Sequence, residues 1–286
     1  MGLLVVIVGV LAPLLAIALA HRGTAPPGRG PAADKGGQII AGEAAVRGQA
    51  TSWITSQVGR DVVVACDAVM CSDLAQHGFP AGNLNVLQPT APNPYGSGLV
   101  VATAGIRSQF GSKLASFFAP TVIATFGTGQ DRIDVRVIAA SGAVAYSAAL
   151  DKDLQARRSS GAVLAASRRI TSAGAVRAQL TSGQVDMRLL TTIAFLSSQE
   201  PVHIIGFAGS APGAGPGVPL RWVYLAATDT GPGARRAGYL QSLIAFSRAL
   251  RPPYVPLSVQ TVRLPGGIAA LRIEFAAPSP LGLLKS

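Results

Sequence analysis

The sequence predicts a mixed α/β protein. A small three-layer, Rossmann-like domain is followed by an α+β sandwich domain, and both come after an N-terminal transmembrane helix. Residues 3–20 form an uncharged apolar run. In the chain that follows, short β-branched runs alternate with amphipathic helical patterns. The hydrophobic fraction is 49% against 13% charged residues, which favours a packed core and excludes both a largely disordered chain and a coiled coil.

The N-terminal run LLVVIVGVLAPLLAIALA, residues 3–20, has the length and apolarity of a membrane-spanning helix. Two interpretations stay open: a permanent single-pass anchor, or a cleaved signal segment with the small residues 18–20 as its cleavage site. A signal segment usually starts with basic residues, and here only Met1 and Gly2 precede the apolar run. Residues 21–41 are rich in Pro and Gly, which predicts a linker between the membrane and the globular part.

The first globular domain is predicted over residues 42–140. A helix over 43–58 carries one apolar face, and the stretch DVVVACD has the continuous β-branched character of a buried parallel strand. The last stretch, 132–138, alternates apolar and polar residues, which predicts a half-buried antiparallel edge strand. The remaining predicted elements are helices over 67–76 and 106–118 and strands over 84–88, 98–104 and 121–126.

The second domain is predicted over residues 141–286. It begins with a long Ala-rich helix over 143–166 that is interrupted at 159–161. Ser182 is expected to cap the following helix, with Asp186 adding negative charge to its first turn. The remaining predicted elements are helices over 185–196 and 239–250, strands over 202–207 and 222–228, and a hairpin of strands over 258–265 and 269–276.

The glycine-rich segment 209–219 resembles a nucleotide-binding loop only in its glycine spacing. A phosphate loop should open a helix, whereas this segment leads into a predicted strand, so we expect a flexible hairpin or lid. Three His and two Cys leave little material for a metal site, and no metallohydrolase or nucleophile motif occurs. We therefore expect neither a metal nor a cofactor.

The chain carries 24 Lys and Arg against 13 Asp and Glu, a formal net charge of +11. Most of the positive charge is arginine, which pairs with phosphates and carboxylates, so anionic lipid headgroups or anionic envelope polymers are favoured partners. Nucleic acid is disfavoured because no long basic run, zinc finger or RNA-recognition motif occurs. The basic pairs, as at Arg157-Arg158 and Arg168-Arg169, are expected to lie on a solvated surface.

Three stretches in residues 50–138 resemble one known family. They read WITSQVGRDVVVACDAVMCSDLAQHGFP, LVVATAGIRSQFG and VIATFGTGQDRIDVRVI. Their order is similar to that in the soluble C-terminal domain of actinobacterial membrane glycosyltransferases of the mannosyltransferase-like type. The catalytic acidic residues of that family lie in its transmembrane part, which has no counterpart here. The resemblance therefore implies a location outside the cytoplasm, but not glycosyl transfer. The whole chain also resembles actinobacterial single-pass envelope proteins.

Cys66 and Cys71 are separated by four residues, which is not the spacing of a thioredoxin-like redox site. Outside the cytoplasm, where the resemblance places them, such a pair is most simply a disulfide. Two buried free thiols in a reducing compartment are the alternative. A literal positive-inside count, using Arg22, Arg29 and Lys35, would place the globular part in the cytoplasm instead.

Asp67 stands at the carboxyl end of a predicted parallel strand, where open α/β sheets hold their ligands. Thr103 and Arg107 follow another strand of the same predicted sheet and are expected to share this crevice. The alternative roles are helix capping for Asp67 and a solvated side chain for Arg107.

These features together predict a membrane-anchored binding or accessory protein of the cell envelope. It would lie outside the cytoplasm, catalyse nothing itself, and have a membrane glycosyltransferase or an anionic envelope polymer as partner. One alternative is an enzyme acting on envelope glycan, with Asp67 or Asp186 as acid/base, although glycosidase chemistry needs two carboxylates at a defined separation. The other alternative is a membrane-anchored regulator that faces the cytoplasm.

Overall fold

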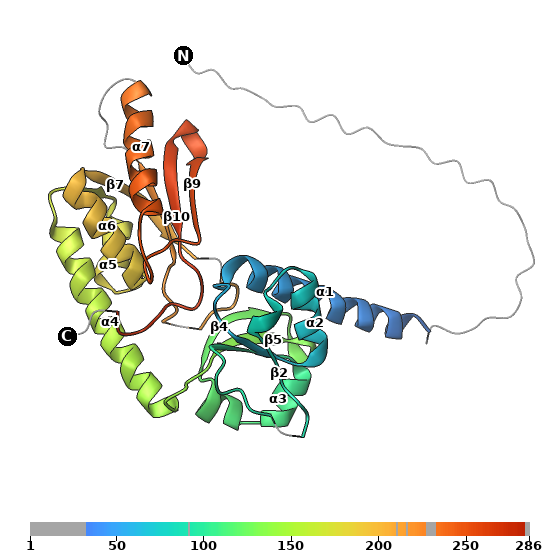
Figure 1. Ribbon diagram of the computed structural model, residues 1–286. Coiled ribbons are helices and arrows are strands. Elements are labelled where there is room, and N and C mark those ends of the chain that lie inside the picture. The colour runs from blue at the N-terminus through green and yellow to red at the C-terminus, as the bar shows by residue number, and fades with distance from the viewer. Residues whose placement is uncertain (1–32, 91, 210, 216, 227–232, 284–286) are drawn as a thin grey trace, which may run out of the picture.

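The computed structural model describes residues 33–90, 92–209, 211–215, 217–226 and 233–283. It shows a mixed α/β protein with two five-stranded mixed sheets (Figure 1). We call the part around the first sheet the first lobe and the part that begins with helix α4 the second lobe. The predicted membrane segment, 1–20, lies outside the described residues. Among the helices that are described, none is long and apolar enough to cross a membrane.

The first lobe contains short strands and the helices between them. Its sheet has the strand order β2-β1-β3-β5-β4; β1 is parallel to β2 and β3, and β5 is antiparallel to β3 and β4. In chain order the elements are α1 (Ala33–Gln57), β1 (Val64–Cys66), α2 (Ala68–Gln76), η1 (Ala81–Asn83), β2 (Leu84–Val86), β3 (Leu99–Ala102), α3 (Ala104–Phe110), η2 (Leu114–Phe118), β4 (Thr121–Phe126), η3 (Gly129–Asp131) and β5 (Ile133–Val137).

Helices cover both faces of the first sheet. On one face, Val101 of β3 belongs to a buried apolar cluster with Ile54 of α1 and Leu74 of α2. On the other face, the neighbouring Val100 packs in a separate cluster with Ile106 of α3. Successive side chains of a strand point to opposite faces, so a run of consecutive apolar residues in β3 supplies both clusters.

β5 is an interior strand, so the prediction of an edge strand over 132–138 is wrong. The alternation comes from Asp134 and Arg136, and both side chains are buried. Asp134 accepts hydrogen bonds from Thr125 Oγ1 at 2.9 Å and from Arg136 at 3.4 Å, and Arg136 donates to the carbonyl oxygen of Ala119 at 2.7 Å. Polar groups that satisfy one another inside a protein give the same alternation as a strand with one solvated face.

Two predicted helices differ from the observed ones. α1 begins at Ala33, so residues 33–41 of the predicted linker are helical. Extending a formed helix fixes only one residue for each hydrogen bond gained, so the helix predicted over 43–58 can extend toward the N-terminus at little cost. The predicted helix over 106–118 is divided, because Gly111 ends α3 with a φ of 54° and a π-helical turn follows over Leu114–Phe118.

The second lobe has the strand order β6-β7-β8-β10-β9. β6 and β7 are parallel, and the other pairs are antiparallel. One face of this sheet shares a large buried apolar cluster with α5, α6 and α7. The elements are α4 (Ala143–Ala166), β6 (Ile170–Ser172), α5 (Gly174–Thr181), α6 (Met187–Gln199), β7 (Val202–Ala208), β8 (Trp222–Ala226), α7 (Gly233–Arg248), β9 (Ser258–Arg263), η4 (Pro265–Gly267) and β10 (Ala269–Glu274).

β6 and α5 were not predicted, and they change two expectations nearby. α4 runs unbroken through Gly161, because the glycine lets α5 approach: an added Cβ would come within 2.6 Å of the carbonyl carbon of Leu180. Ser182 ends α5 and does not cap the next helix. Asp186 is the N-cap of α6, and its side chain accepts a hydrogen bond from the backbone N–H of Arg188.

The segment between β7 and β8 crosses to the first lobe and is not the free hairpin or lid that we expected. Thr125 of β4 donates its backbone N–H to the carbonyl oxygen of Pro212 at 2.7 Å, and Gly215 donates to Val122 at 3.1 Å. Gly213 has a φ of 58°, and an added Cβ would lie 2.8 Å from Cβ of Thr125. The glycines of this segment therefore allow its backbone to lie along β4.

The C-terminal tail also returns to the first lobe. Ala277 donates its backbone N–H to the carbonyl oxygen of Gln57 at 2.7 Å. Beneath this contact, the guanidinium of Arg221 donates to the carbonyl oxygen of Phe275 at 2.5 Å and to Gln57 Oε1 at 3.2 Å. Arg221 is only 2% exposed, and this burial lowers its pKa to about 10. The two lobes are thus joined through buried polar contacts as well as through α4.

Candidate functional site

A crevice of the first lobe lies at the carboxyl ends of β1 and β3. These strands are parallel, so the residues that follow them, Asp67 and Thr103, are brought to one edge of the sheet. The crevice has a volume of about 460 Å³. It is lined by Glu43, Arg47, Asp67, Ala68, Val69, Val86, Leu87, Gln88, Pro89, Thr103, Ala104, Gly105, Gln130, Asp131 and Ile133.

Asp67 caps a helix and lines the crevice at the same time. Its Oδ1 accepts the backbone N–H of Met70 at 2.9 Å, which satisfies one of the unpaired donors at the start of α2. Its Oδ2 accepts a short hydrogen bond, 2.5 Å, from Thr103 Oγ1. The capping role and the crevice role, which the sequence presents as alternatives, therefore coexist. Thr103 uses its hydroxyl on Asp67 and does not cap α3 with it.

Arg107 lies beside the crevice and does not line it. Its guanidinium donates to the backbone carbonyl oxygens of Ala102 at 3.0 Å, of Gln130 at 2.8 Å and of Arg132. These bonds fix the turn before β5, and Gln130 of that turn is part of the crevice wall. Arg107 is therefore placed to position the wall and not to contact a ligand directly.

The crevice combines carboxylates with exposed apolar side chains. Glu43, Asp67 and Asp131 line it together with a single cation, Arg47, which forms a 3.2 Å ion pair with Asp73 outside the lining. Val69 and Val86 line it while remaining 55% and 41% exposed. Such walls suit an uncharged or cationic ligand better than an anion.

Sequence reasoning missed the crevice residues other than Asp67 and Thr103. Glu43 comes from a helix that precedes the sheet, and Asp131 comes from the turn before an antiparallel strand. The rule that ligands gather at the carboxyl ends of parallel strands finds neither of them. Val86, at the end of β2, does obey that rule, but the predicted strand over 84–88 places it in the interior of the strand.

Cys66 and Cys71 flank Asp67 in the sequence and lie at disulfide distance. Their Cα atoms are 5.5 Å apart, and both residues are buried. The pair connects the last residue of β1 to the first turn of α2. It thereby holds the strand end and the helix start that present Asp67 to the crevice.

Asp186, the second carboxylate considered for acid/base chemistry, is enclosed in the second lobe. It is 1% exposed and accepts hydrogen bonds from Arg188 Nη2 at 2.7 Å and from Ser279 Oγ at 2.5 Å. Burial alone would raise the pKa of this carboxyl, but the bonds and charge of Arg188 outweigh burial and hold the pKa below its usual value. An enclosed, fully bonded carboxylate of this kind cannot reach a glycan, so its role is structural.

In the part of the chain that the structure describes, no three His, Cys, Asp or Glu side chains are placed so that they could hold one metal ion, the three crevice carboxylates included. Comparison with known proteins finds no matching family model, no similar curated protein and no similar solved structure.

Proposed function

We propose that the chain is a binding or accessory protein of the cell envelope, anchored through residues 3–20, with its globular part outside the cytoplasm. It binds its ligand in the first-lobe crevice and catalyses no reaction of its own. Within this proposal, the first lobe is a small three-layer, Rossmann-like unit and the second is an α+β sandwich. The observation that carries the proposal is the crevice of about 460 Å³ on which Asp67 and Thr103 converge.

Two features support the location. The apolar run 3–20 is long enough to span a bilayer. Cys66 and Cys71 lie at disulfide distance, and disulfides persist mainly outside the cytoplasm. Protease added to intact protoplasts should therefore digest residues 42–286. Complete protection until the protoplasts are lysed would overturn the location and would favour the regulator that faces the cytoplasm.

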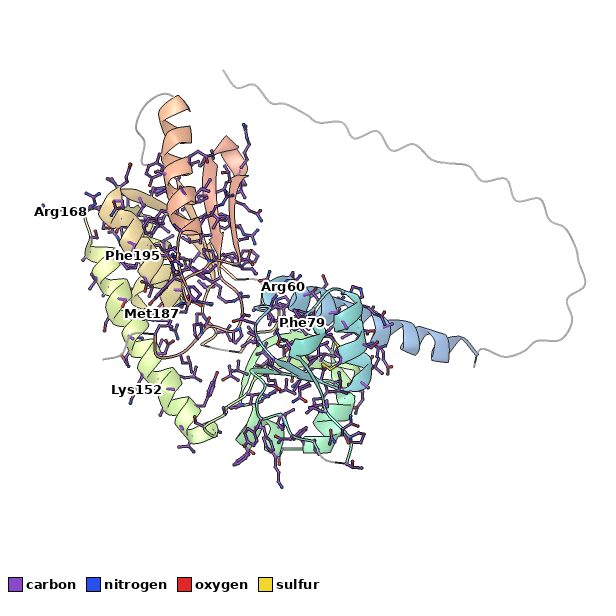
Figure 2. The ribbon with its side chains drawn as sticks, viewed as in Figure 1. Arg60, Phe79, Lys152, Arg168, Met187 and Phe195 are labelled. Atoms are coloured by element: carbon purple, nitrogen blue, oxygen red, sulfur yellow. A yellow bond between two sulfur atoms is a disulfide. The ribbon has the colours of Figure 1, made fainter. Side chains whose placement is uncertain are left out.

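A second contact of the proposed protein is an anionic envelope polymer, which would be held by exposed arginines. The crevice is unsuited to it, because three carboxylates line the crevice. Figure 2 shows Lys152 and Arg168 on the outer side of the second lobe, away from the crevice, and both are exposed. A membrane glycosyltransferase remains a proposed partner through the same outer surface.

The crevice is tested by sedimenting the full-length protein, held in nanodiscs, with purified cell-wall material at about 1 M salt, where contacts between exposed charges are screened. Asp67→Ala combined with Thr103→Val should reduce the affinity about tenfold, which corresponds to the loss of one or two good hydrogen bonds. Asp151→Ala, on an exposed turn of α4, is the matched control and should bind as the parent protein does. Equal binding by all three proteins would refute the crevice as the site.

The enzymatic alternative has its own readout in the same samples. Turnover of wall glycan that is lost in Asp67→Asn would show that Asp67 acts as an acid or base. That result would overturn the proposal of a binding protein and favour an enzyme that acts on envelope glycan.

A further inference from the structure

One face of the second sheet is turned away from the helices. In β8 and β10, Val223, Leu225, Leu271 and Ile273 belong to the buried cluster shared with α5, α6 and α7. The residues between them therefore leave the sheet on the opposite side. In Figure 1 the helices α4 to α7 of the second lobe stand on one side of strands β9 and β10. We call the opposite surface, carried by Trp222, Tyr224, Arg272 and Glu274, the open sheet face.

Pairing in the sheet brings these four side chains together. Glu274 is paired with Trp222, and Arg272 with Tyr224, across the antiparallel β8–β10 ladder. The guanidinium carbon of Arg272 lies 3.8 Å from the centre of the Trp222 ring. Glu274 Oε2 accepts hydrogen bonds from Arg272 Nη2 at 2.6 Å and from Ser258 Oγ at 3.3 Å. The face is thus a compact cluster of one aromatic–cation stack and one ion pair.

The cluster also holds hydrogen-bonding atoms that have no protein partner. In the described part of the chain, five buried side-chain polar atoms are unpartnered, and three of them belong to this face: Trp222 Nε1, Arg272 Nε and Glu274 Oε1. Glu274 is only 4% exposed, and its register directs it to the open sheet face. Buried polar atoms are nearly always hydrogen-bonded, so three unpaired atoms in one place indicate a site that an outside molecule completes.

A strip of bare backbone lies next to Tyr224. Its partner on β7 is Gly206, and a Cβ added there would meet no atom within 4 Å. The neighbouring position, opposite Trp222, is Ala208. Glycine and alanine add no more than a methyl group beside Tyr224 and Trp222, so a flat molecule could lie on β7 with its side against the Tyr224 ring.

The charges of the face decide the class of ligand. The buried carboxylate of Glu274 disfavours an anion, and the guanidinium of Arg272 disfavours a cation. The unpaired atoms are two donors and one acceptor, which need a ligand that offers both acceptors and a donor. A hydroxyl group supplies both, and neighbouring hydroxyls on a ring can reach several of these atoms at once. We propose that the open sheet face binds a neutral saccharide.

Arg272 covers the cluster at rest. Its side chain is 23% exposed and lies over Trp222. A rotation about its flexible side-chain bonds would uncover Trp222 Nε1 and Glu274 Oε1 and turn its own Nε toward the ligand. This site lies on the second lobe and shares no residue with the crevice of the first lobe. The proposal therefore does not rest on the proposed function, and either can fail without the other.

The experiment uses the tryptophan fluorescence of the full-length protein in nanodiscs. The chain has two tryptophans, Trp53 and Trp222, so a Trp53→Phe background leaves Trp222 as the sole reporter. Cellotriose, maltotriose and mannotriose are titrated separately, with triglycine as a neutral peptide probe. We expect a saturable change in emission with at least one trisaccharide and none with triglycine.

Variants assign the change to the open sheet face. Tyr224→Ala and Glu274→Gln should each weaken the affinity for that trisaccharide about tenfold or more. The first removes the aromatic ring, and the second replaces a charged acceptor group with a neutral amide. Tyr95→Ala, at an exposed aromatic residue of the first lobe, should leave the affinity unchanged. Circular dichroism confirms folding, and Tyr224→Ala keeps the test decisive if the Glu274 variant does not fold.

Three outcomes would overturn the proposal. The first is that no trisaccharide changes Trp222 emission up to about 10 mM, a concentration above the dissociation constant of even a weak site. The second is a response that Tyr224→Ala leaves intact. The third is tighter binding of triglycine than of any trisaccharide, which would assign the face to peptides.

Discussion

Arg157 Nε lies 2.7 Å from Asp153 Oδ2, one turn earlier on α4, and both side chains are almost fully buried. Arg157 also donates to the carbonyl oxygen of Gly183, beyond the end of α5. The neighbouring Arg158 is exposed. The expectation that Arg157-Arg158 forms a solvated pair is therefore wrong for its first member, because successive residues of a helix point about 100° apart. A face of α4 that carries charges is packed against the rest of the second lobe.

Replacing Arg157 should destabilise the protein much more than replacing Arg158. Arg157→Ala leaves the buried carboxylate of Asp153 without its partner, which should lower the free energy of unfolding by about 3–5 kcal/mol. Arg158→Ala removes an exposed side chain and should change it by less than about 0.5 kcal/mol. Urea unfolding followed by circular dichroism measures both. Equal effects of the two substitutions would show that the Arg157–Asp153 pair is not buried in solution.

Gly161 should be the least replaceable glycine of the helices that the structure describes. Gly161→Ala places a methyl group against the backbone of Leu180 in α5, so α4 and α5 must separate. We expect a loss of about 1–3 kcal/mol in the free energy of unfolding, as for other overpacked sites. Gly48→Ala in α1 is the matched control, since an added Cβ there meets nothing within 4 Å. It should be neutral or stabilise by up to about 1 kcal/mol through the higher helix propensity of alanine.

Local patterns in the sequence are sufficient to predict a helix where apolar residues recur at helical spacing along one face. The helix that carries Leu189, Ile193 and Leu196 was predicted from its spacing, and these residues are buried in the second-lobe core. The proximity of Asp67 and Thr103 also follows from the sequence, because each ends a strand of a parallel pair. That the crevice binds a ligand stays a prediction.

Buried charges could not be predicted in this way. Asp134, Arg157 and Arg221 look like surface residues in any short window of sequence, and charged residues are rarely buried without a partner. Their burial depends on groups that are distant in the chain: Arg221 donates to Gln57, 164 positions away. The same reason explains why β5 was taken for an edge strand. Only the assembled fold shows which polar groups satisfy one another.

The exposed arginines should control binding to anionic polymers. Arg158, Arg168 and Arg177 are exposed, and replacing all three with Gln should weaken binding to anionic wall polymer without lowering stability. Binding should also fall as salt rises, because charges farther apart than about 10 Å are screened at 0.1 M ionic strength. Co-sedimentation at increasing salt measures both effects. Binding that does not depend on salt would contradict an electrostatic contact.

Two buried aspartates should give opposite pH dependences of stability. The pKa of Asp186 is lowered, because the bonds and charge of Arg188 outweigh burial. Its stabilising contribution is therefore present above the unfolded pKa of about 3.9 and is lost as pH falls through the folded value. The pKa of Asp153 is raised, because burial outweighs its contact with Arg157. As pH falls, the Asp153 carboxylate is therefore protonated in the folded protein before it is protonated in the unfolded chain. The contribution of Asp153 to stability then increases as pH falls.

The two effects are separated by comparing the parent protein with Asp186→Asn and Asp153→Asn between about pH 7 and pH 2, a range that contains ordinary carboxyl pKa values. Carboxylates common to all three proteins cancel in the difference between parent and variant. The free energy of unfolding of the parent minus that of Asp186→Asn should fall as pH falls, because only the parent loses the Asp186 carboxylate. The free energy of unfolding of the parent minus that of Asp153→Asn should rise as pH falls, because only the parent gains from protonation at position 153. Urea unfolding at each pH measures both differences. Slopes of the same sign would show that burial does not outweigh the contact with Arg157 at Asp153, or that the bonds and charge of Arg188 do not outweigh burial at Asp186.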